Sequence, residues 1–331
     1  MSEGALPLAD GCAGEAVADL QTRLLEAGIS PITDAFCTFG ASTRAAVESF
    51  QRQRGLRIDG VVGPMTWSTL TEAGLRLGDR LLYRAHPMQR GDDVAELQSR
   101  LCSLGFDTGR VDGIFGDQTA FALAEFQRNV QIPIDATAGL ATVGELVRVS
   151  GRHQTLELVT MVREREHLRS AAPTLRGRHI GIGGIDGMSA ITAALSRRLG
   201  ALGARVTLLH DADESAQAQG ANLAGVDVYL GLRLAADHGT WSSAWYKGYS
   251  YESTSGRELA EWIAGTVGER LSTSMNASGM SLAVLRETRM PAVLIEIGPA
   301  EVVVEHSGLL VEVLLEALGR WAEPAAAEST S

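Results

Sequence analysis

Three side chains near the ends of apolar runs have the chemistry to hold a catalytic metal ion. His210 and His238 follow such runs, and Glu296 lies inside the last one. Imidazole and carboxylate groups are ligands that zinc takes in hydrolases, where three protein ligands leave one position open for water. Histidines and acidic residues near strand ends are also common as plain surface residues. Either interpretation depends on the elements that position these residues.

The C-terminal half of the chain alternates between strand-like and helix-like segments. The runs HIGIGG, ARVTLL, VDVYLGL and AVLIEIG have the composition of buried strands. Helical periodicity predicts helices over 189–202, 254–271 and 302–321. This alternation favours a mostly parallel sheet covered by helices, in which ligands bind at the carboxyl ends of strands. The residues after Ile182, Leu232 and Ile295 are therefore the expected site.

The N-terminal half contains two copies of one module. GEAVADLQTRLLEAGI returns as GDDVAELQSRLCSLGF at a shift of 77 residues, and FGASTRAAVESFQ returns as FGDQTAFALAEFQ at a shift of 76. Chance does not place so many identities in register. The sequence therefore predicts two domains of the same fold.

Each copy is predicted to be a three-helix unit of about 60 residues, a size that is marginally stable alone. Apolar residues at i, i+3 and i+7 mark one buried helical face, and in the first copy they are Val17, Leu20 and Leu24. Gly28 is expected to end that helix, because glycine adopts the left-handed conformation most easily. Thr43, or Thr119 in the second copy, is the predicted N-cap of the second helix, and 63–70 forms a third.

Composition narrows the function classes. The chain has 331 residues, 29 Lys plus Arg and 40 Asp plus Glu, for a formal net charge of −11. This balance disfavours nucleic acid or an anionic membrane as the main partner. The segment MSEGALPLAD lacks the features of a signal peptide, and no apolar run is long enough for a membrane span, so we expect a cytoplasmic protein. The spacing of Cys12, Cys37 and Cys102 disfavours both a disulfide framework and a zinc knuckle.

The repeats resemble the peptidoglycan-binding domain type 1 family. The resemblance rests on V-x-x-LQ-x-x-L-x-x-x-G followed by DG-x-FG-x-x-T and FQ, as in VDGIFGDQT of the second copy. It implies a ligand loop in that copy, formed by Asp112, Gly113, Phe115 and Gly116. The first copy reads ITDAFCTFGAST at this place, which departs from the pattern. The alternative is that the matched residues only build a helical core.

The C-terminal half resembles the zinc-dependent N-acetylmuramoyl-L-alanine amidase type 3 family, as the strand order and the segment MPAVLIEIG indicate. That family supplies a His after the first strand, a Glu shortly afterwards, a His in an S-x-HxN segment and a Glu in the last strand. Here the first two are missing, and Arg233 stands where the second His is expected. Of the four, Glu296 alone remains. The resemblance therefore implies a pseudoenzyme without metal or other cofactor, and the alternatives are a substitute set from His210, His238 and Glu296 or an active zinc amidase of muropeptides.

A carboxylate left on a buried strand without its cation needs another partner, because burial of an unpaired charge is costly. We therefore predict that the guanidinium of Arg233 takes the place of the zinc ion and pairs with both oxygens of Glu296. The alternative is that Arg233 points to solvent.

Aromatic residues gather in WSSAWYKGYSY, shortly after Arg233. Partner surfaces are often anchored by such residues, so one interpretation makes this segment a partner-binding surface, formed by Trp241, Trp245, Tyr246, Tyr249 and Tyr251. The other interpretation is a half-buried strand, since the spacing is mostly even.

The whole chain resembles one group within these families, the CwlM group of cytoplasmic amidase homologues in actinobacteria, with RLGDRLLY, GDDVAELQSRL and LRETRMP among the shared segments. The resemblance implies a regulator of peptidoglycan precursor synthesis. Its implied partner is the cytosolic UDP-N-acetylglucosamine enolpyruvyl transferase (MurA), and a serine/threonine kinase and peptidoglycan precursors are further candidates. The tail departs from that group and offers Ser329, Thr330 and Ser331 to a kinase.

The predicted architecture is multidomain, with two small three-helix domains followed by an α/β amidase-like domain with a mostly parallel sheet. The expected boundaries are 11–72 and 88–148 for the repeats, 149–176 for a linker helix, 177–322 for the amidase-like domain and 323–331 for a disordered tail.

Overall fold

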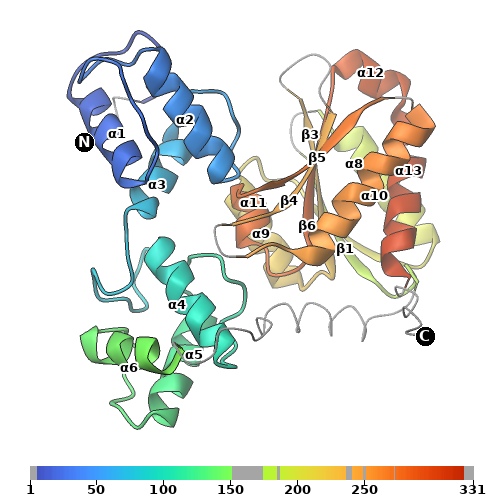
Figure 1. Ribbon diagram of the computed structural model, residues 1–331. Helices are drawn as coiled ribbons and strands as arrows, with labels where there is room; N and C mark the ends of the chain where they lie inside the picture. The colour runs from blue at the N-terminus through green and yellow to red at the C-terminus, as the bar shows by residue number, and fades with distance from the viewer. Residues whose placement is uncertain are drawn as a thin grey trace, which may run out of the picture. The chain divides into compact units, whose positions relative to one another are not determined.

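The computed structural model describes residues 6–150, 174–184, 187–235, 241–248, 251–271 and 273–323 (Figure 1). The chain divides into two compact units, of which the first is Met1–Thr160 with Gly248–Tyr251, and the second is Met161–Lys247 with Glu252–Ser331. Most of the predicted linker helix and nearly all of the predicted tail lie outside the described residues. None of the described helices is long and apolar enough to cross a membrane.

The first unit contains two three-helix repeats, each with its own apolar core. The first repeat consists of α1 (Glu15–Glu26), α2 (Ala41–Gln53) and α3 (Pro64–Ala73). The second repeat consists of α4 (Asp92–Ser103), α5 (Asp117–Asn129) and α6 (Leu140–Ser150). The predicted end of α1 is confirmed, because Gly28 adopts a φ of +80° just beyond the helix, and Gly105 adopts +93° beyond α4.

Buried glutamines join each helix to the next one. In the second repeat, Gln98 donates to Asp112 Oδ1 at 2.9 Å and to Thr119 Oγ1 at 3.0 Å, and its Oε1 accepts from the N–H of Gly113 at 2.8 Å. The same arrangement of one glutamine with the following loop and the threonine of the next helix recurs at Gln21, Gln51 and Gln127. These glutamines are almost fully buried, so the arrangement fixes the loop between two helices.

The predicted threonine N-caps are wrong. Gly40 is the N-cap of α2 and Gly116 is the N-cap of α5, and a glycine has no side chain to cap its helix. Thr43 and Thr119 lie inside the first helical turn, where their hydroxyls accept from Gln21 and Gln98. Threonine at this position therefore accepts a hydrogen bond from a buried glutamine instead of capping the helix.

The second unit is built on a six-stranded sheet with the order β2-β1-β3-β6-β4-β5. The strands are β1 (His179–Gly184), β2 (Arg205–Leu209), β3 (Val228–Leu234), β4 (Trp241–Tyr246), β5 (Met275–Met280) and β6 (Ala292–Ile297). All neighbouring strands are parallel except β4 and β6. The predicted fold class, helical repeats followed by an amidase-like domain with a mostly parallel sheet, is confirmed.

Helices cover both faces of this sheet (Figure 1). One face carries α8 (Ser189–Ala201), α10 (Thr254–Leu271) and α13 (Ser307–Ala322), whose apolar residues form the main core with the strands. The other face carries α9 (Glu214–Ala224) and α11 (Ala283–Glu287), and the short α12 (Ala300–Glu305) precedes α13. The carboxyl ends of β3 and β6 lie next to each other, which brings together the residues expected at the site.

Candidate functional site

Three polar side chains lie side by side across the centre of the sheet. Arg233 of β3 is in register with Glu296 of β6, and Ser242 of β4 is in register with the same Glu296. Partners in register on adjacent strands project to the same face, so the three side chains meet. The expected site at the carboxyl ends of β3 and β6 therefore contains an arginine, a carboxylate and a hydroxyl from the amino end of β4.

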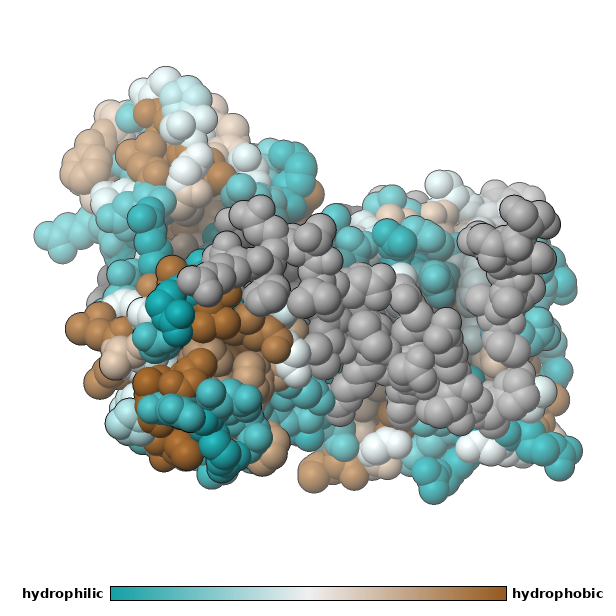
Figure 2. All heavy atoms as spheres, turned by 60° about the horizontal axis from the view of Figure 1, so that its bottom comes forward, coloured by the Kyte–Doolittle hydropathy of each residue, from teal (hydrophilic) through white to brown (hydrophobic). Residues whose placement is uncertain are grey.

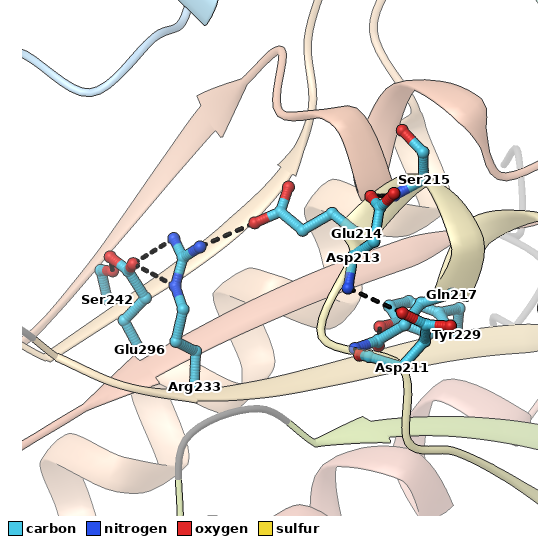
Figure 3. Close-up of polar contacts among 9 residues, drawn as sticks. All are labelled: Asp211, Asp213, Glu214, Ser215, Gln217, Tyr229, Arg233, Ser242 and Glu296. Carbon is cyan, nitrogen blue, oxygen red and sulfur yellow. Dashed lines mark hydrogen bonds and ion pairs between the residues drawn. The ribbon is translucent and has the colours of Figure 1, made fainter. Parts of the chain in front are cut away.

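The Arg233 guanidinium lies between two carboxylates (Figure 3). Its Nε donates to Glu296 Oε1 at 2.8 Å, its Nη2 donates to the same oxygen, and its Nη1 donates to Glu214 Oε1 at 2.7 Å. The other Glu296 oxygen accepts from Ser242 Oγ at 3.3 Å. The predicted pairing of Arg233 with Glu296 is confirmed, but the prediction that the fork binds both oxygens of Glu296 is wrong, because its other edge turns to Glu214.

Glu214 is the member of this group that sequence reasoning missed. It is the first residue of α9, which begins just after β2, and Asp213 caps the helix by accepting from the N–H of Ser215 at 2.8 Å. The side chains of Arg233, Glu214 and Glu296 are each about one-fifth exposed, at 19%, 20% and 21%. The acidic run DADE directly after a strand was the available signal, because such a run lies at the same edge of a parallel sheet.

A buried tyrosine occupies the same face beside this ion-pair group. Tyr229 Oη donates to Gln217 Oε1 at 2.5 Å, and burial raises the pKa of this phenol above its ordinary value. A Cβ at Gly183 would lie 2.1 Å from Tyr229 Oη, and one at Gly231 would lie 3.1 Å from the Tyr229 ring. The glycines of β1 and β3 therefore make room for the ring, which fills the space beneath α9.

The site does not fit a zinc ion. A guanidinium has no lone pair for a metal, and here it already binds the two carboxylates that face it. Within the ranges that the structure describes, no group of three or more His, Cys, Asp or Glu side chains is arranged to hold a metal. His210 is exposed beyond β2, and His238 lies outside the described residues. Of the substitute ligands His210, His238 and Glu296, the carboxylate of Glu296 is already paired with Arg233.

His179 lies at the amino end of β1, away from this group. It is the first residue of β1, and its ring lies between Thr207 Oγ1 and Arg205 Nη2, each at 2.8 Å. Burial first, and then the Arg205 charge, lowers the pKa of His179 below 6.5. This histidine therefore serves the fold as a neutral side chain.

The aromatic segment does not form the expected exposed surface. Trp241 and Trp245 belong to the main core of the second unit, and their indole N–H groups donate to Gly298 O at 2.6 Å and Glu252 Oε1 at 2.9 Å. Tyr246 and Tyr251 are also buried, and Tyr249 lies outside the described residues. The partner-binding interpretation is therefore wrong for the two tryptophans, which support a strand of the sheet.

The expected ligand loop of the second repeat is occupied by its own contacts. Asp112 accepts from Gln98 and from the N–H of Ile114, Gly113 donates to Gln98, and Phe115 is fully buried in the repeat core. Gly116 is the N-cap of α5. These four residues hold the loop in shape, and their role in ligand binding stays a prediction.

The departing loop of the first repeat is held in a different way. Asp34 Oδ2 accepts from the N–H groups of Thr43 at 2.6 Å and Gly40 at 3.1 Å. The hydrogen bond from the Thr43 backbone is the main reason why the pKa of Asp34 falls to about 2. Cys37 takes the place of Gly113 and keeps a left-handed φ of +69°. The first repeat thus reaches the same backbone shape with other side chains.

Comparison with known proteins finds a family model that matches the repeats and a relative that matches most of the chain. Residues 13–70 and 90–146 match the family model described as "Putative peptidoglycan binding domain". The chain is 36% identical over 296 residues to N-acetylmuramoyl-L-alanine amidase CwlM of Mycobacterium tuberculosis. This alignment covers 78% of this chain and 71% of that protein. The chain is also 50% identical over 60 residues to the spore cortex-lytic enzyme of Bacillus cereus, covering 18% of this chain and 23% of that enzyme. A solved N-acetylmuramoyl-L-alanine amidase of Clostridium difficile 630 aligns with a TM-score of 0.37 at 16% identity, covering 47% of this chain and 100% of that one.

Proposed function

Because the chain belongs to the N-acetylmuramoyl-L-alanine amidase family that includes CwlM, we propose that it is a non-catalytic regulator of peptidoglycan precursor synthesis. It binds the cytosolic UDP-N-acetylglucosamine enolpyruvyl transferase (MurA) and raises the turnover of that enzyme. This proposal makes the amidase-like domain a scaffold without hydrolytic chemistry, and it places the protein in the cytoplasm.

The position of Arg233 carries the proposal. An amidase of this family needs zinc to polarise the amide carbonyl and to activate water. In this chain the cation at the ends of β3 and β6 is the guanidinium of Arg233. It donates hydrogen bonds to the carboxylates of both Glu296 and Glu214. A guanidinium held by two carboxylates can stabilise the fold, but it cannot coordinate and activate a water molecule as a zinc ion does.

Binding and turnover measurements test the proposed partner. Calorimetry with the purified enolpyruvyl transferase should show a heat of binding, and the turnover of the transferase should rise when this chain is added. The measurement is made with chain that has been treated with a serine/threonine kinase and with untreated chain. No heat of binding in either state would contradict the proposed partner.

Hydrolysis measurements separate the proposal from the alternative of an active amidase. Muropeptides incubated with the chain and excess zinc should release no peptide. Release of peptide that disappears in the Glu296→Gln variant would instead support the zinc-dependent amidase.

A further inference from the structure

An open pocket lies in the second repeat, on a side of α5 that the sequence did not single out. Its volume is about 580 Å³, and its lining includes two aromatic rings and three carboxylates, from Phe106, Phe121, Asp107, Asp117 and Glu125. Three of these residues follow each other on α5 at i, i+4 and i+8, so they form one stripe along the helix. The pocket is within the range of volumes that ligand sites have.

The lining combines negative charge with an exposed ring. Phe121 is 67% exposed, which is unusual for a phenylalanine in a small helical repeat. Figure 2 shows apolar patches on the surface of the repeats next to hydrophilic residues. Aromatic rings attract cations over their faces. Carboxylates attract cations by charge and accept hydrogen bonds from them. Together these groups suit a positive group carried on an apolar stem.

The present ion-pair partners of Asp117 and Glu125 can be exchanged. Asp117 pairs with Arg84 at 2.6 Å, and both side chains are about 70% exposed, at 70% and 69%. Glu125 pairs with Arg128 of its own helix, and this arginine is also more than half exposed. Exposed pairs of this kind contribute about 0–1 kcal/mol each, so an incoming cation can replace them at low cost.

The first repeat provides an internal comparison. The same scaffold carries Ser30, Ala41, Ala45 and Ser49 where the second repeat has Asp107, Asp117, Phe121 and Glu125. All four residues that give the pocket its charge and its exposed ring are thus absent from the first copy. The fold of the repeat does not require them, because both copies form the same three helices.

We propose that this pocket is an interaction site for a basic segment of a partner protein. A lysine or arginine side chain lies over the ring of Phe121, and its charge lies between the carboxylates of Asp107, Asp117 and Glu125. Charge complementarity commits the site to a basic occupant, since the whole chain carries a net charge of −11. The aromatic ring of the pocket adds a second contact for such an occupant. This site goes beyond the proposed function, and it does not depend on the identity of the enzyme that the chain regulates.

Fluorescence anisotropy with the full chain tests this site. The probe is a labelled peptide, Gly-Ser-Lys-Leu-Lys-Leu-Lys-Ser-Gly, and the matched peptide carries norleucine in place of each lysine. The lysine peptide should bind, and the norleucine peptide should not. Phe121→Ala should weaken binding about fivefold through the lost ring contact. The double variant Asp117→Asn, Glu125→Gln should weaken it about tenfold.

A matched variant on α6 separates a site from general attraction to an acidic protein. Glu145 pairs with Arg148 three residues later, as Glu125 pairs with Arg128, but Glu145 does not line the pocket. Glu145→Gln should therefore leave the affinity unchanged. The proposal is overturned by absence of binding, by equal binding of both peptides, or by equal loss of affinity in Glu145→Gln and the pocket variants.

Discussion

Arg233 and Glu296 face each other in register on the parallel strands β3 and β6, and one carboxylate oxygen accepts from two nitrogens of the guanidinium. The register brings the side chains together without help from any loop. The third nitrogen reaches Glu214 on α9, so the same arginine ties a helix to the sheet. In this family member the Arg233 guanidinium thus binds one carboxylate near the end of β6 and another at the start of α9.

Removal of this cation should destabilise the second unit. Arg233→Met removes the cation that Glu214 and Glu296 share, and we expect the free energy of unfolding to fall by about 3 kcal/mol. Arg233→His should lower the free energy of unfolding by a similar amount, and it should not restore hydrolysis. Denaturant unfolding of the full chain measures both.

An exposed ion pair of the same unit provides the control for this prediction. Arg198 pairs with Glu312 at 2.6 Å, and the two side chains are 57% and 45% exposed. Arg198→Met should cost less than about 1 kcal/mol. Equal losses in Arg198→Met and Arg233→Met would show that the Arg233 group adds no more than a surface pair.

The buried glutamines should be among the most sensitive polar residues of the repeats. Gln51 donates to Asp59, to Val61 O and to Thr66, and it accepts from two backbone N–H groups of the loop. Gln51→Ala removes all of these hydrogen bonds, and we expect the free energy of unfolding to fall by about 3 kcal/mol. Gln53→Ala, at an exposed position of the same helix, should change stability by less than about 0.5 kcal/mol. Similar thermal midpoints for both variants would contradict this role.

Four equivalent loop positions of the repeats have a left-handed backbone. They are Cys37, Gly60, Gly113 and Ala136, with φ between +53° and +72°. Cys37→Gly and Ala136→Gly should each stabilise by about 0.5–1 kcal/mol, because a side chain is strained in this conformation.

The reverse change should destabilise the second repeat. Gly113→Ala should cost about 1–2 kcal/mol, since its Cβ would also lie 3.0 Å from Gly91 O. Gly144→Ala is the opposite control, because Gly144 lies inside α6 with open space around it and should gain about 1 kcal/mol. Urea unfolding resolves these differences, and a stabilising Gly113→Ala would contradict the backbone argument.

His179 should make stability dependent on pH. Its pKa in the folded chain lies below 6.5, so the unfolded chain binds a proton more readily than the folded chain does. The contribution of His179 to the free energy of unfolding is therefore complete above pH 6.5, the ordinary pKa of the unfolded chain. It is lost as the pH falls from there through the lower pKa of the folded chain. His179→Gln should flatten this part of the stability curve, measured by denaturant unfolding between neutral and mildly acidic pH. An unchanged curve would show that His179 does not carry this dependence.

Sequence reasoning located those parts of the fold that depend on apolar composition. The predicted run HIGIGG is β1, and AVLIEIG contains β6, because strands that are buried on both faces are apolar throughout. The helix that carries Glu214 was missed, since ESAQAQGANLA has few apolar residues to mark a buried face. The glutamine contacts were missed for a related reason. Glutamine is usually a surface residue, and only the structure shows Gln98 inside the repeat.

Zinc content tests the central claim most directly. The purified chain is equilibrated with excess zinc, freed of unbound metal, and measured by elemental analysis beside its Glu296→Gln variant. With Arg233 in contact with both carboxylates, we predict far less than about one zinc per chain and no difference between the two proteins. About one zinc per chain, lost in the Glu296→Gln variant, would show that the site binds metal and would contradict the account.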